Sequence, residues 1–143
     1  MSLAALRRIR DPLAWMRKVC GALAGTTEVV SWGHPNFRAG GRTFTVFEIC
    51  KGRPCIAIAT DPEEQSLLIE RFGLFRTPYL GSRGWVSAWV DQPAPFQLMG
   101  ELIRRAYRRN IEKTRSRKTV RSSARRTVRR RARGSRPETD SAR

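Results

Sequence analysis

The hydrophobic and polar positions of the chain follow two periods, one typical of helices and one typical of strands. Apolar residues recur at helical spacing over residues 13–23, directly after Asp11-Pro12. Such a pair favours a helix start, because Asp caps the helix and Pro suits its first position. A second helix is predicted after Asp61-Pro62, and a third begins at Phe96.

Between the first two helices, short runs rich in β-branched and aromatic residues predict four strands, at residues 28–32, 36–38, 43–49 and 54–59. Glycine-containing turns at residues 40–41 and 51–53 separate the later runs as hairpins. A turn-rich stretch then leads to a fifth strand at residues 85–90. This order favours an α+β fold, in which helices cover one face of a mainly antiparallel sheet.

Charge changes this picture at the C-terminal end of the chain. The formal net charge of the 143 residues is +17, and residues 111–143 carry thirteen Lys and Arg against three acidic residues. This segment has few apolar side chains, so burial cannot offset the entropy that ordering costs. We therefore expect one folded domain over residues 1–110 and a disordered, arginine-rich tail over residues 111–143.

The remaining composition narrows the class of protein. The chain has an odd number of cysteines and no close CxxC pair, which fits a reducing compartment. The three cysteines are Cys20, Cys50 and Cys55. One histidine, His34, cannot complete an ordinary zinc site by itself, so we expect no metal and no cofactor. Apolar runs are too short to span a bilayer. The basic, amphipathic start also fits a transit peptide, but the first helix of the fold is the preferred interpretation.

Three segments together resemble a known family. They are SWGHPNFR at residues 31–38, ATDPEE at residues 59–64 and TPYLGSRGWV at residues 77–86. In order and spacing they resemble the MmcQ/YjbR family, over residues 12–109. The resemblance implies a bacterial protein with a fold like that of CyaY and frataxin, a twisted antiparallel sheet against helices. It also implies DNA binding through a "double-wing" pair of hairpins, and it supplies no catalytic residue.

Cations near the predicted turns are candidate phosphate contacts. Arg38 and Arg42 flank one turn, and Lys51 and Arg53 flank the next, so two hairpin tips would carry four cations. An ordinary solvated surface explains these four equally well. The last helix and the tail extend the set of candidate nucleic-acid-binding residues to Arg38, Arg42, Lys51, Arg53, Arg83, Arg104, Arg105, Arg108, Arg109, Arg125, Arg126, Arg129, Arg130 and Arg131.

A second hypothesis is a ligand pocket formed by the aromatic residues and the histidine of the family segments, Trp32, His34, Tyr79 and Trp85. A histidine titrates near neutral pH and suits acid–base chemistry. Catalysis would need a partner such as Ser31, Asp61 or Cys55 within hydrogen-bond reach. A structural histidine at a turn is the preferred interpretation.

The glycine-rich stretch at residues 79–85 has two interpretations. Its backbone amides and Arg83 could cradle an anion. It lacks the lysine-serine ending and the following helix of a P-loop, however, and it precedes a strand. A tight turn, whose glycines permit unusual backbone angles, is therefore preferred.

Together these features predict a nucleic-acid-binding protein, for DNA rather than RNA, with little or no sequence specificity. The sheet domain would orient the protein, and the tail would supply most of the electrostatic free energy. The alternative is a small-ligand or protein-binding domain with a pocket around His34 and Trp85, the tail being incidental. We expect no enzymatic activity, no membrane partner, a monomer, and a cytoplasmic location with nucleoid association as an alternative.

Overall fold

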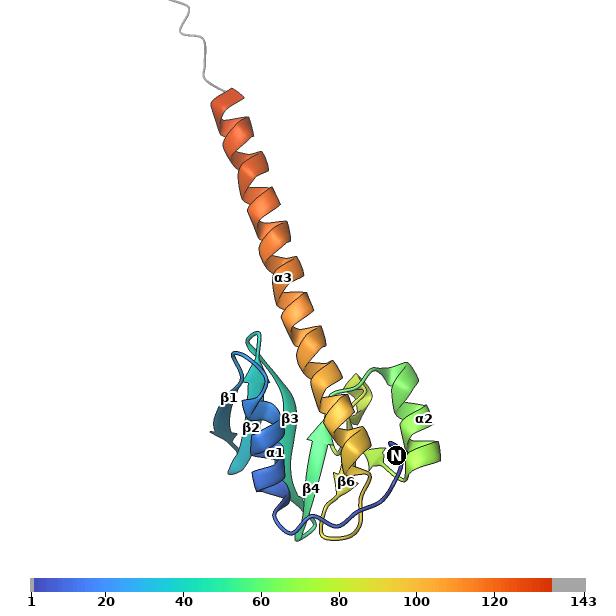
Figure 1. The fold of residues 1–143 in the computed structure, drawn as a ribbon. Coiled ribbons are helices and arrows are strands. Elements are labelled where there is room, and N and C mark those ends of the chain that lie inside the picture. Colours follow the sequence, from blue (N-terminus) through green and yellow to red (C-terminus); the bar gives the residue numbers. More distant parts are fainter. Residues whose placement is uncertain (1, 135–143) are drawn as a thin grey trace, which may run out of the picture.

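A computed structural model of the chain describes residues 2–134, with side chains as far as Thr119. The elements are α1 (Pro12–Gly21), β1 (Thr27–Ser31), β2 (His34–Ala39), β3 (Arg42–Cys50), β4 (Arg53–Ile58), α2 (Pro62–Phe72), β5 (Phe75–Arg76), the 3₁₀ turn η1 (Gly81–Arg83), β6 (Val86–Trp89) and α3 (Phe96–Gly134). The strands form one antiparallel sheet in the order β1-β2-β3-β4-β6-β5. The predicted α+β fold with an antiparallel sheet is confirmed (Figure 1).

The two Asp-Pro pairs start helices as the sequence predicts. The Asp11 carboxylate accepts a hydrogen bond from the backbone N–H of Ala14 at 3.0 Å, and Asp61 accepts one from Glu64 at 2.8 Å. Each bond satisfies an N–H that the first helical turn leaves without a partner. The left-handed Gly73, with φ of 69°, ends α2.

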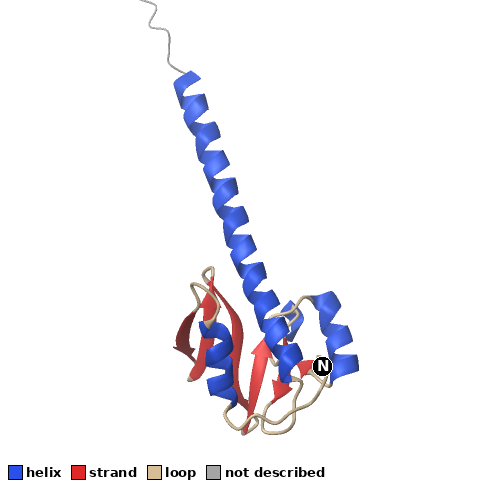
Figure 2. Cartoon of the chain, viewed as in Figure 1, coloured by secondary structure: helices blue, strands red, loops and turns tan. Residues whose placement is uncertain are grey.

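All three helices pack on the same face of the sheet (Figure 2). Ile56 and Ile58 of β4 point into this main core, together with Met16 of α1, Leu68 of α2 and Leu102 of α3. Successive residues of a strand point to opposite faces. Ala57, which lies between Ile56 and Ile58 in β4, therefore faces away from the helices.

This outer face of the sheet carries a small second cluster, in which Ala57 packs with Val46 and Trp85. Leu80, from the segment before η1, lies against the cluster. The sheet is thus covered by helices on one face and only partly covered on the other.

The hairpin turns on either side of β3 lie at opposite ends of the sheet (Figure 1). Gly40 and Gly41, with φ of 61° and 77°, join β2 to β3, and Lys51 and Gly52, with φ of 52° and 77°, join β3 to β4. Two positive φ values are what the tightest hairpin turns need. Because β3 has nine residues between these turns, they lie about 30 Å apart.

Helix α3 holds the first of these turns. The Asn110 side chain donates hydrogen bonds to the carbonyls of Ala39 and Arg42, at 3.2 and 3.1 Å. The Thr114 hydroxyl donates to the Gly40 carbonyl at 3.0 Å. Ile111 also packs against the main core. Contacts with the domain therefore continue past residue 110, where the sequence predicts that the folded part ends.

Beyond Thr114, α3 leaves the domain and stays helical to Gly134 (Figure 1). The sequence places the end of the folded part at residue 110, and helical backbone continues across this boundary; residues 135–143 lie outside the described residues. The physical reason is that adding a residue to an existing helix requires no burial, and Arg, Lys and Ala are good helix formers. No helix of the described residues is both long and apolar enough to cross a membrane.

Candidate nucleic-acid interface

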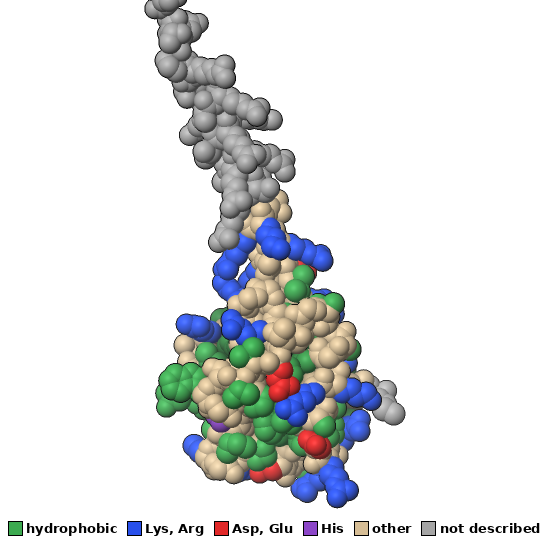
Figure 3. All heavy atoms as spheres, turned by 90° about the vertical axis from the view of Figure 1, so that its left-hand side faces the viewer, with side chains coloured by type: hydrophobic (Ala, Val, Ile, Leu, Met, Phe, Trp, Pro, Cys, Tyr) green, Lys and Arg blue, Asp and Glu red, His purple; other side chains and the backbone are tan. Residues whose placement is uncertain are grey.

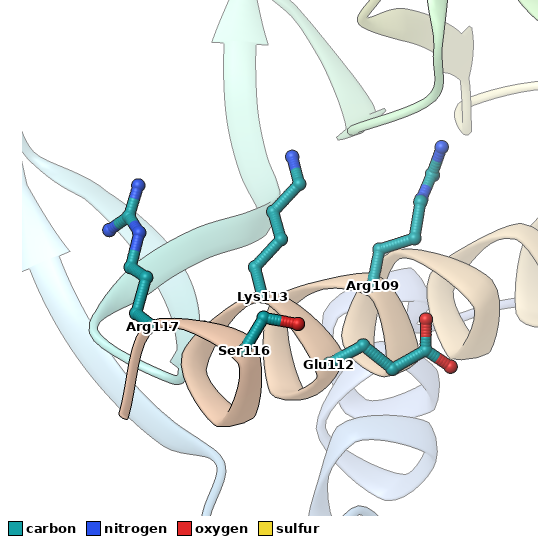
Figure 4. Close-up of a pocket in the computed structure, with 5 residues that line it drawn as sticks. All are labelled: Arg109, Glu112, Lys113, Ser116 and Arg117. Atoms are coloured by element: carbon teal, nitrogen blue, oxygen red, sulfur yellow. The ribbon is translucent and has the colours of Figure 1, made fainter. Parts of the chain in front are cut away.

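A row of cations follows the length of α3. Every fourth residue from Arg109 to Arg133 is Arg or Lys, at positions 109, 113, 117, 121, 125, 129 and 133. Residues four apart on a helix are neighbours on its surface. The side chains of Arg109, Lys113 and Arg117 indeed point to the same side of the helix (Figure 4). We call these seven residues the α3 row.

From residue 113 onward, the charge of this helix is not balanced by acidic residues within the helix. Residues 113–134 include eleven Lys and Arg and no Asp or Glu. At a rise of 1.5 Å per residue, the stretch is about 33 Å long. Figure 3 shows Lys and Arg side chains gathered where α3 leaves the domain. The result is a basic rod that begins at the domain surface.

An open groove of about 810 Å³ lies beside the start of the row, and we call it the outer groove. Residues of β2, β3, the start of α2, η1 and α3 line it, above the cluster of the outer sheet face. Its charged residues are Arg38, Arg42, Asp61, Arg83, Arg109 and Lys113. Five cations and one carboxylate make it an electropositive groove.

Arg109, like Arg38, is already engaged within the fold. Its Nη2 donates to the Ala59 carbonyl at 2.7 Å, and its Nη1 lies 3.7 Å from the Asp61 carboxylate. By contrast, Arg42, Arg83 and Lys113 form no ion pair with any residue from 2 to 119. These three remain available to an anionic ligand.

Of the two predicted wings, only the one with Arg38 and Arg42 lies next to the groove and the row. Lys51 and Arg53 lie at the other end of β3, so the four cations do not form one surface. Arg53 is also engaged within the domain, with two 2.8 Å hydrogen bonds to the Asp91 carboxylate and a guanidinium 4.3 Å from the Trp89 ring centre. The hydrogen bond with Asp91 raises the pKa of Arg53 and lowers that of Asp91.

The arginines in the first half of α3 are paired with acidic side chains. Arg105 lies 2.7 Å from a Glu64 carboxylate oxygen. The Glu101 carboxylate lies 3.9 Å from Arg104, 3.7 Å from Arg105 and 3.3 Å from Arg108. Two carboxylates therefore offset much of this charge, and these candidates are less suited to phosphate contact than the α3 row. The remaining candidates belong to α3, whose backbone is described there, but nothing is described of their side chains. They are Arg125, Arg126, Arg129, Arg130 and Arg131.

The glycine-rich stretch at residues 79–85 is a tight structural loop. The backbone N–H groups of Gly81, Arg83 and Gly84 donate to carbonyls within the stretch or just before it. The Gln65 side chain bridges the Gly81 and Trp85 carbonyls, at 2.8 Å to each. Few amides are thus left to cradle an anion. The geometry fits the interpretation as a turn, with Arg83 free at its surface.

Comparison with known proteins assigns the chain to a family. The model of the YjbR family matches residues 21–109, which include all three family segments noted in the sequence. The chain belongs to the YjbR family. A crystal structure of a Deinococcus radiodurans protein with a DUF419 domain has a similar fold, with a TM-score of 0.60 and 23% identity. The match covers 69% of this chain and 80% of that chain. The comparison with curated proteins gives no match.

The matched range of this YjbR-family chain ends at Arg109, the first residue of the α3 row. The basic rod therefore lies outside the part of the chain that the family model covers. The groove, by contrast, lies mostly within it, apart from Lys113.

The four residues of the predicted pocket are not brought together by the YjbR-family domain. Trp32, in the β1–β2 turn, is 95% exposed, and Tyr79 is fully exposed, so neither forms the wall of a closed cavity. His34 is half-buried at the start of β2, beside its cross-strand partner Ser31. Trp85 alone of the four lines the outer groove.

Two of the three proposed acid–base partners of His34, Asp61 and Cys55, are engaged elsewhere. The imidazole forms no hydrogen bond with residues 2–119, and Asp61 caps α2. Cys55 is fully buried in β4, and this burial raises the pKa of its thiol. A thiol held protonated in this way is a poor nucleophile.

Sequence reasoning did not single out Lys113 and Arg117. Both lie in the segment that was expected to be disordered, where residue spacing has no structural meaning. Their spacing of four from Arg109 was nevertheless visible in the sequence, and it becomes informative once the segment is helical.

Proposed function

We propose that this YjbR-family chain binds nucleic acid through its phosphates, with DNA as the principal ligand and with little sequence specificity. The observation that carries the proposal is the α3 row, a cation at every fourth position of a helix that leaves the domain. Phosphate contact supplies most of the affinity of non-specific binding.

The dimensions of the row suit a nucleic-acid strand. Cations four residues apart on a helix are separated by about 6 Å along its axis, and one DNA strand has a phosphate about every 3.4 Å. A helix also fits into the major groove, which is about 12 Å wide. Arg and Lys can therefore reach phosphates along the whole length of the rod.

The domain supports the same surface at the base of the rod. Arg38 and Arg42 of the β2–β3 hairpin lie beside Lys113 in the outer groove. The hydrogen bonds from Asn110 and Thr114 hold this hairpin against α3. The hairpin and the row thus form one continuous basic surface, which would fix the direction in which the rod leaves the domain.

The test compares two double variants that remove the same charge. In the first, Lys113→Gln and Arg117→Gln interrupt the row, and glutamine keeps the helix propensity. In the control, Arg10→Gln and Arg71→Gln remove two exposed cations that form no ion pair among the described residues. Fluorescence anisotropy with a labelled duplex, over a range of salt concentrations, gives the slope of log K against log salt.

Each lost phosphate contact flattens this slope by about 0.9. The row variant is expected to lose about 1.8 from the slope, and the control close to none. Equal effects of the two variants would mean that net charge alone, and not the row, determines binding. Competition with single-stranded DNA and structured RNA at one salt concentration then tests whether duplex DNA is the preferred ligand.

A further inference from the structure

We infer that the outer groove binds one unpaired nucleotide, with its base on the floor and its phosphate on the cationic rim. This inference rests on the proposed function and adds a site for single-stranded nucleic acid or a strand end. The groove volume of about 810 Å³ falls in the range of small-molecule sites, about 300–1,000 Å³.

The floor of the groove is apolar. Val46 and Trp85 belong to the buried cluster of the outer sheet face, and Leu80 packs against them. A nucleobase has two apolar faces, which bind well to aromatic and aliphatic surfaces. Stacked inside a duplex, a base cannot offer such a face to the groove, whereas an unpaired base can.

The rim of the groove supplies unpaired positive charge. Arg42, Arg83 and Lys113 are exposed and form no ion pair with residues 2–119. They come from β3, from η1 and from α3, so they approach the groove from different sides. A phosphate group prefers this arrangement, since it accepts several charge-assisted hydrogen bonds at once.

Two polar side chains distinguish a nucleotide from a wholly anionic ligand. The Asn36 amide nitrogen donates to the His34 carbonyl at 2.9 Å, which leaves the amide oxygen free as an acceptor. The exposed Asp61 carboxylate also lines the groove. A carboxylate repels an acidic peptide or a second phosphate, but it accepts hydrogen bonds from the amino groups of a base.

The groove is continuous with the α3 row, because Lys113 belongs to both. Figure 4 shows this side chain between Arg109 and Arg117, on the same side of the helix. A strand whose phosphates follow the row would therefore reach the groove at the base of the rod, where a terminal or unpaired nucleotide can enter.

The test is an NMR titration of the full ¹⁵N-labelled chain with deoxycytidine 5′-monophosphate, chosen because its base carries an amino group. Deoxycytidine and inorganic phosphate serve as separate control ligands. With the nucleotide, we expect saturable chemical-shift changes at the backbone amides of Thr43, Val46 and Leu80. Deoxycytidine alone or inorganic phosphate alone should cause much smaller changes. Shifts of equal size with inorganic phosphate would show an anion site without base recognition, and shifts confined to α3 would show that the groove is not used. Either result overturns the inference.

A variant keeps the inference separate from the proposed function. Arg83→Gln removes a rim cation that no described residue uses, and we expect nucleotide affinity at the groove to fall by about tenfold. Arg71→Gln is the control, and it should leave the titration unchanged. If Arg83→Gln also leaves it unchanged, the rim assignment is refuted. Duplex affinity that still depends on Lys113 and Arg117 would then leave the proposed function standing.

Discussion

The like charges of the α3 row predict that repulsion between them destabilises the helix beyond the domain. Between Arg109 and Arg133 the row contains six pairs of like charges four residues apart. Each such pair destabilises a helix by about 0.2–0.5 kcal/mol, so the total is about 1–3 kcal/mol. The rod extends away from the domain (Figure 1). Neutralisation by phosphates or screening by salt should therefore increase helix content.

The perturbation is a fourfold variant, in which Arg121, Arg125, Arg129 and Arg133 are replaced by glutamine. It removes four of the six like-charge pairs, worth about 1–2 kcal/mol, and glutamine has nearly the helix propensity of arginine. Replacing the same four residues by lysine is the matched control, because it preserves both charge and propensity.

Far-UV circular dichroism at low salt is the assay. We expect more helix in the glutamine variant than in the native chain, and no gain in the lysine variant. Added salt should raise the native signal and close the difference, since exposed charges are screened. If the glutamine variant matches the native chain at low salt, or if the difference does not respond to salt, repulsion along the row does not limit the helix.

Three further predictions concern the domain itself. Gly40→Ala should lower the melting temperature, because φ is 61° and the added Cβ would clash with the Thr114 hydroxyl. A double-mutant cycle with Thr114→Ala should show coupling between the two sites. Gly84→Ala should destabilise the folded domain by about 1–3 kcal/mol in denaturant melts, since φ is 96° and the added Cβ would lie 2.5 Å from the Thr60 carbonyl oxygen. A denaturation curve like that of the native chain would contradict this. The lowered pKa of Asp91 means that its bond to Arg53 stabilises the fold above the unfolded pKa of about 4 and is lost as pH falls through the folded value. Asp91→Asn should therefore weaken the acid dependence of stability, and an unchanged pH profile would exclude this pair as a contributor.

Much of the fold could be read from local signals. The Asp-Pro helix starts and the turns at Gly40 and Gly52 act through their own backbone angles and caps, so nearby residues suffice to predict them. The two-residue strand β5 was not predicted, because so short a run has no readable period.

The site was harder to predict, since it depends on contacts between distant parts of the chain. Arg53 was a candidate phosphate contact, but its partner Asp91 lies 38 residues away and is not evident from spacing. Successive turns of an antiparallel sheet must lie at opposite ends, a rule that separates Lys51 from Arg42 and could have been applied to the sequence. The end of the folded part was placed at residue 110 from burial alone, whereas an existing helix can continue past its core contacts.

The most direct measurement of the central claim is the duplex affinity of the chain ended after Thr114, compared with the full chain over a range of salt concentrations. This end point keeps the hydrogen bonds of Asn110 and Thr114 to the β2–β3 hairpin and removes the five row residues from Arg117 onward. We predict weaker binding at every salt concentration and a salt slope flatter by about 4–5, as expected for five lost phosphate contacts. Unchanged affinity and slope would contradict the account, because the row would then contribute nothing to binding.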